Sequence, residues 1–216
     1  MRRVLKLALA TAAVGLAAGP AFGQSATING TPIPLNGSTT IHFGGPTGTT
    51  ASADLFLQLT GVNTTTGVFD FNYTFTNTNS SVSNLTGFGF QANPTLLNIT
   101  GTGMHFVVNP ITFPGGFDVD ACAYVGNNCS AANNQADLFS GVFHLTFAPG
   151  TSSVALDSWV VRYASLTQLN NTSGEGTPTP PVPEPATWAM MLIGFGGIGL
   201  AMRRSRRRDA TLMQVA

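Results

Sequence analysis

The sequence lacks charge. Lysine, arginine, aspartate and glutamate make up only 8% of its 216 residues, whereas an ordinary soluble domain has about 25%. This scarcity argues against a charge-rich cytosolic enzyme and against a generally basic nucleic-acid binder. Hydrophobic residues reach 43%, which argues against wholesale disorder. The length is sufficient for one domain of ordinary size together with shorter segments.

The formal net charge of zero is a sum over three segments of different charge. Eight of the nine basic residues lie in the first six positions or within 203–208. Residues 24–182 contain seven acidic residues, no lysine and a single base, Arg162, so their net charge is −6. Basic ends beside apolar runs are typical of membrane-topology signals, and we expect no nucleic-acid partner.

Residues 1–23 have the order of features found in a signal peptide. Three basic residues among the first six precede an apolar, alanine-rich run over residues 7–18. Small residues at positions 21 and 23 then fit the −3 and −1 positions of a cleavage site. We predict that signal peptidase cuts after Gly23, so that the middle of the chain folds outside the cytoplasm.

The C-terminal region predicts a linker and one membrane-spanning helix. Residues 171–182 are rich in Pro, Gly and Thr, which is typical of an extended linker. Residues 186–202 are almost entirely apolar; as a helix they would measure about 25 Å, at the short end of what spans a bilayer. Five arginines follow and act as a stop-transfer signal that stays cytoplasmic: Arg203, Arg204, Arg206, Arg207 and Arg208. Residues 209–216 are then a cytoplasmic tail.

A short motif precedes this helix. Pro183, Glu184 and Pro185 form a triplet that is followed in register by Trp188, Ala189, the glycine-rich apolar run and the arginine cluster. Residues 181–208 therefore resemble the PEP-CTERM sorting signal, in the variant with Trp-Ala after the triplet. The tail at 209–216 is a departure, because the family usually ends soon after the arginines.

The resemblance implies a bacterial protein that is handled by an exosortase, a membrane-embedded cysteine transpeptidase. Its sorting signal is held transiently in the inner membrane while the ectodomain lies in the periplasm. The signal is then cut near the triplet, and the ectodomain passes to the cell surface or the exterior. By resemblance, Pro183, Glu184 and Pro185 are the recognition residues.

Residues 24–170 predict one all-β domain. In the run 68–76, apolar and polar residues alternate, so that one face packs in a core and the other meets water. Further runs of strand composition lie between clusters of turn residues, at 39–43, 54–60, 86–91, 97–100, 105–108, 137–147 and 154–164. We expect a single antiparallel β-sandwich, jelly-roll or Ig-like; a β-solenoid is the alternative, although no clean repeat period is present.

The two cysteines, Cys122 and Cys129, predict a disulfide, since an even count in an exported protein favours pairing. Closing a loop of eight residues stabilises a fold by about 2–3 kcal/mol in the chain-entropy account. A metal site needs more ligands close by than these cysteines have.

Residues with catalytic potential are few. His42, His105 and His144 are scattered singly, and Asp118 and Asp120 supply too few oxygens for a Ca²⁺ site. A G-x-G-x-x-G run lies inside the predicted membrane helix, where no strand precedes it, so it does not indicate a dinucleotide site. We predict no catalytic residue, no metal and no cofactor.

These observations lead to two functional hypotheses. The first is a non-enzymatic surface or extracellular-matrix protein, associated with exopolysaccharide and processed by an exosortase. The alternative is a secreted carbohydrate-binding module or weak glycoside hydrolase, whose paired carboxylates need not be close in sequence. For the module, Trp159 and Tyr163 share one face of a predicted strand; they form either a sugar-stacking platform or part of the core.

Overall fold

The computed structural model describes residues 24–113, 115–126, 128–129, 136–170, 172–179 and Phe195. The chain divides into two compact units, one ending at Pro178 and one beginning at Thr179. The predicted signal peptide lies outside the described residues, and so does the predicted membrane helix except for Phe195. Within the described part of the chain, no helix is long and apolar enough to cross a membrane.

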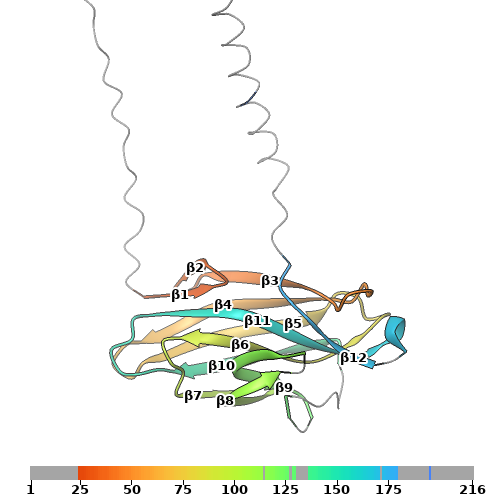
Figure 1. Cartoon of the computed structure of the whole chain (residues 1–216). Helices are drawn as coiled ribbons and strands as arrows, with labels where there is room; N and C mark the ends of the chain where they lie inside the picture. Colours follow the sequence, from red (N-terminus) through yellow and green to blue (C-terminus); the bar gives the residue numbers. More distant parts are fainter. Residues whose placement is uncertain are drawn as a thin grey trace, which may run out of the picture. The chain divides into compact units, whose positions relative to one another are not determined.

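Residues 24–179 form two β-sheets (Figure 1). One sheet has the order β2 (Thr31–Pro34), β1 (Ser25–Ile28), β11 (Ser153–Leu166), β6 (Asn84–Asn93), β9 (Phe117–Tyr124) and β8 (His105–Phe113), with β12 (Thr172–Gly176) also paired to β11. The other has the order β3 (Ser38–Gly44), β4 (Ser52–Asn63), β5 (Val68–Asn77), β10 (Leu138–Thr146) and β7 (Asn98–Gly101). Their described pairings are antiparallel except that β1 runs parallel to β11. The prediction of an all-β sandwich is confirmed.

Strand β5 shows why these residues form strands. Its aromatic side chains alternate with polar ones, and the aromatic set is buried, as the period of two predicts. Phe71 stacks on Phe143 of the neighbouring strand β10 with ring centroids 5.1 Å apart. Each such cross-strand pair fixes the register as well as filling the core.

The core between the sheets is aromatic. From β6 of the seven-stranded sheet, Phe88 contacts Tyr73 and Phe75 of β5, at centroid distances of 5.9 and 5.4 Å. Trp159 of β11 stacks on Phe90 at 4.6 Å and donates its indole N–H to the Leu156 carbonyl. Since Trp159 and Tyr163 are fully buried, they belong to the core and not to a sugar-stacking platform.

The C-terminal boundary of the domain differs from the predicted one. Residues 172–176, expected within the linker 171–182, form β12 and pair with β11. Pro178 also forms a β-bridge with Phe43. The glycines of β12 are required by close contacts: a side chain at Gly176 would collide with the Gly44 carbonyl and the Tyr163 ring. The prediction of a linker over these residues was wrong, because these glycines allow a close approach between strands and do not mark a flexible segment.

The N-terminal hairpin of β1 and β2 was also missed. Asn29 and Gly30 both have positive φ, 46° and 77°, as a two-residue type I′ turn requires. The turn was recognisable from its Asn-Gly sequence, but the four-residue strands on either side are too short to show a period.

Candidate functional site

The outer face of the five-stranded sheet is rich in uncharged polar groups. On β4, Leu55, Leu57 and Leu59 point into the core and are fully buried, so the residues between them point outward. The outward set over the whole sheet, hereafter the five-stranded face, is mostly hydroxyl and amide side chains. It includes Ser38, Thr40, His42, Asp54, Phe56, Gln58, Asp70, Asn72, Thr74, Thr76, Leu138, Ser140, Val142 and His144.

Phe56 interrupts this polar surface. Its side chain belongs to the outward set, and 38% of the residue is exposed. Thr40 of β3 and Thr74 of β5 lie directly opposite Phe56 in the ladder. Gln58 and Asp54 flank it along its own strand. The ring is therefore surrounded by hydroxyl, amide and carboxylate groups.

Two histidine–aspartate pairs lie on the same face. His42 and Asp54 are opposite each other across β3 and β4, with Nδ1 and Oδ1 2.7 Å apart. His144 and Asp70 are opposite each other across β10 and β5, at 2.6 Å. Each aspartate therefore has a hydrogen-bonding partner, and all four side chains are partly exposed.

The third histidine lies elsewhere, and no metal centre is formed by these residues. His105, at the start of β8, packs against Tyr124 in a tilted arrangement, with ring centroids 5.5 Å apart. Asp120 accepts a hydrogen bond from the Ala92 amide at 2.9 Å and so ties β9 to the end of β6. The described residues contain no group of three or more His, Cys, Asp or Glu side chains able to hold a metal ion.

The outer side of the seven-stranded sheet carries a second apolar cluster. On β11, Val160 points away from the core that holds its neighbours Trp159 and Val161. This outer cluster consists of Phe113, Val119, Cys122, Cys129 and Val160. Cys122 and Cys129 form a disulfide, as predicted, with their Cα atoms 6.3 Å apart.

Arg162 is buried on the same side of β11 as Val160. Only 8% of its side chain is exposed; Nη2 donates to the Ser173 hydroxyl at 3.0 Å, and Nη1 lies 3.8 Å from Glu175 Oε1. Burial lowers the pKa of the Arg162 guanidinium, while the Glu175 carboxylate opposes this shift. The sequence did not predict the Arg162–Glu175 pair, because Glu175 falls within the predicted linker.

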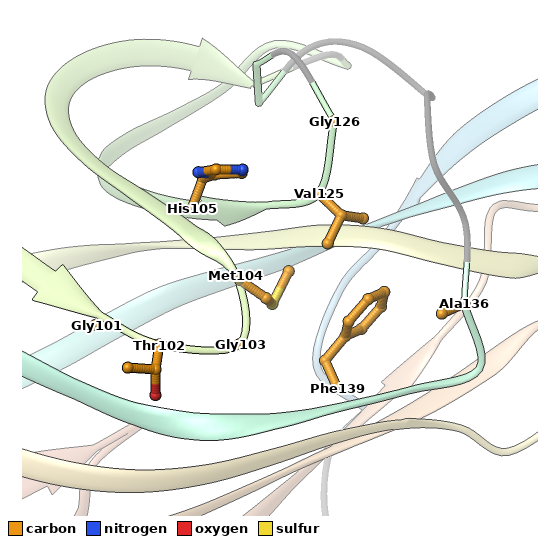
Figure 2. A pocket seen from close by; sticks show the side chains of 9 residues that line it. All are labelled: Gly101, Thr102, Gly103, Met104, His105, Val125, Gly126, Ala136 and Phe139. Atoms are coloured by element: carbon orange, nitrogen blue, oxygen red, sulfur yellow. The ribbon is translucent and has the colours of Figure 1, made fainter.

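A cavity of about 650 Å³ opens near the start of β8 and β10 (Figure 2). Met104, Val125 and Phe139 point toward one another across it. Thr102 and His105 are the polar side chains among its described lining, which contains no carboxylate.

Tyr73 fixes the segment that forms one wall of this cavity. Its phenol donates a hydrogen bond to the Thr102 carbonyl at 3.0 Å. Burial of the ring raises the pKa of Tyr73 to about 12, because the charged phenolate would lose its hydration. The phenol therefore stays protonated at neutral pH and serves as a structural donor.

The predicted sorting and stop-transfer residues lie outside the described part of the chain. They are Pro183, Glu184, Pro185, Trp188, Ala189, Arg203, Arg204, Arg206, Arg207 and Arg208.

Comparison with known proteins gives one informative match. Residues 181–208 match the protein family described as the PEP-CTERM protein-sorting motif. No curated protein matches the chain, and no solved structure matches it. The chain thus carries a PEP-CTERM protein-sorting motif, which implies export, an exosortase as processing partner and sorting to the cell surface.

Proposed function

We propose that the β-sandwich is the mature part of a bacterial extracellular-matrix protein, with a structural role in association with exopolysaccharide. The observation that carries this proposal is the sorting motif at residues 181–208, which begins after the last paired residue of the sandwich, Pro178. A cut near Pro183–Pro185 leaves every described strand in the mature protein.

The covalent chemistry belongs to the partner. By resemblance, the exosortase thiolate attacks a backbone carbonyl near the triplet and forms an acyl-enzyme. The peptide C–N bond breaks, and the C-terminal fragment leaves with the new amine. An amine or water then releases the ectodomain. In this scheme residues 186–202 are a transient anchor and the arginines fix its orientation.

A non-enzymatic role agrees with the polar groups that the structure describes. Asp54, Asp70 and Asp120 are held by hydrogen bonds within the sandwich, and Arg162 is buried beside Glu175. The alternative of a glycoside hydrolase has a direct test, the release of reducing ends from the producer's own polysaccharide. If the protein hydrolyses this polysaccharide and one Asp→Asn substitution abolishes the hydrolysis, the proposed structural role would be wrong and the protein would be a glycoside hydrolase.

Intact-mass analysis of the protein from its native host tests the processing scheme. We expect the loss of residues 1–23 and of everything beyond the triplet. Replacing Pro183, Glu184 and Pro185 by alanine should leave the arginine cluster on the protein. Asp209→Asn, which removes a carboxylate beyond the matched segment, is the matched control and should be processed normally. A mature protein that keeps residues 203–208, with or without the exosortase gene, would contradict the scheme.

A further inference from the structure

We propose that the five-stranded face binds an uncharged polysaccharide, with the Phe56 ring as the platform on which one sugar stacks. This inference rests on the proposed matrix role and names the surface that would carry it. It starts from the unusual position of Phe56, in the middle of a strand and on the wet side of the sheet.

Phe56 differs from the other exposed apolar residues of the sandwich. Leu35 lies in the turn after β2 and Leu97 lies just before β7. Leu138 shares the five-stranded face, opposite Thr76, but is aliphatic and is the first residue of β10. Phe56 is the aromatic member of this exposed set. An aromatic side chain exposed on a sheet gains free energy when an apolar surface covers it.

The surroundings of the ring fit a sugar. One side of a pyranose presents C–H groups that pack on an aromatic ring through dispersion. Its edge presents hydroxyls that both donate and accept hydrogen bonds. Thr40 and Thr74 opposite the ring, and Gln58 beside it, offer donors and acceptors of the same kind.

The charge of the face indicates which polysaccharide is bound. Residues 24–182 contain one base, Arg162, which is buried on the other sheet. On the five-stranded face, Asp54 and Asp70 are paired with His42 and His144. With an acidic domain and no lysine or arginine on this face, an anionic chain gains no attraction. The binding of an uncharged glycan does not depend on electrostatic attraction of this kind.

A second copy of the chain is a poorer occupant. A stable dimer interface buries about 1,600 Å² and has a largely apolar centre. Around Phe56 the described neighbours are hydroxyl, amide and carboxylate side chains. Phe56 on β4 and the apolar Leu138 and Val142 of β10 are separated by the polar residues of β5, so they do not form one apolar centre of that size.

Affinity electrophoresis of the mature protein from the native host tests the proposal. The probe is the producer's own exopolysaccharide, separated by anion exchange into a neutral and an anionic fraction. Wild type should be retarded by the neutral fraction, and Phe56→Ala should weaken this binding by about tenfold or more. Phe56→Trp should retain it. Leu97→Ala, which truncates an exposed apolar residue outside this face, is the matched control and should bind like wild type.

Two further measurements separate the possible outcomes. Raising the salt concentration from about 0.05 to about 0.5 M should leave binding within about twofold, because few charges take part. Phe56→Ala should keep the thermal unfolding transition and the processed mass of wild type. Equal binding of Phe56→Ala and wild type, binding of the anionic fraction alone, or Phe56-dependent self-association without glycan binding would each overturn the proposal. If processing fails while Phe56-dependent binding persists, the sorting scheme is wrong and the glycan surface stands.

Discussion

The outer surfaces of the two sheets carry different groups. The seven-stranded sheet carries the outer cluster, the disulfide and the buried Arg162–Glu175 pair. The five-stranded face has Phe56 among hydroxyl and amide groups, with two partly exposed His–Asp pairs. We infer that one surface stabilises the fold, whereas the other remains open for binding.

Strand β6 shows how the seven-stranded sheet makes room for its second cluster. Phe88 and Phe90 point into the main core and are fully buried, while Gly87 and Gly89 alternate with them. A side chain at Gly89 would meet the Val119 methyls at 3.0 and 3.2 Å. Glycine at position 89 therefore lets the outer cluster lie close to the sheet.

The largest expected effect is at Arg162. Arg162→Met leaves the largely buried Glu175 carboxylate, whose side chain is 16% exposed, without its cation. This change should lower the free energy of unfolding by about 3 kcal/mol. Arg162→Met combined with Glu175→Leu removes both charges and should recover most of the loss. Urea unfolding of the mature protein measures both. A cost below about 1 kcal/mol for the single variant would show that this pair contributes no more than a surface contact.

The disulfide should have the next largest effect. The double variant Cys122→Ala and Cys129→Ala should lose about 2–3 kcal/mol, because its unfolded chain is no longer constrained by the closed loop. A reducing agent should destabilise wild type by a similar amount and leave the variant unchanged. If reduction does not alter the unfolding midpoint of wild type, the disulfide does not help to hold the outer cluster in place.

The sequence allowed some of this fold to be predicted. Strand β5 was evident because its aromatic residues alternate over nine positions, and the disulfide followed from the cysteine count. The sorting motif was readable because its residues are contiguous. Strands β1, β2, β9 and β12 were not predicted. Strands β1, β2 and β12 have only four or five residues, too few to show a period, and β2 and β12 also contain Pro or Gly. In β9, Ala121, Cys122 and Ala123 are buried in a row, so its second half shows no alternation.

The candidate surface was only partly predictable. Leu55, Leu57 and Leu59 alternate in the sequence, and this period already places Phe56 on the wet face with Asp54 and Gln58. The aromatic pair that the sequence suggested for sugar stacking, Trp159 and Tyr163, is buried instead. The His–Asp pairs join residues 12 and 74 positions apart. Their proximity depends on strand register, which a single sequence does not specify here.

The smallest expected effect is at the His–Asp pairs of the five-stranded face. His144→Ala and Asp70→Asn should each change the free energy of unfolding by about 1 kcal/mol or less, because water screens a partly exposed pair. A double-mutant cycle in urea measures their coupling, and the same cycle for His42 and Asp54 is the matched control. Both couplings should be small. A coupling of about 2 kcal/mol or more would mean that this face also stabilises the sandwich. The inferred difference between the two surfaces would then be wrong. Substitutions that adapt such a face to a ligand would also destabilise the fold.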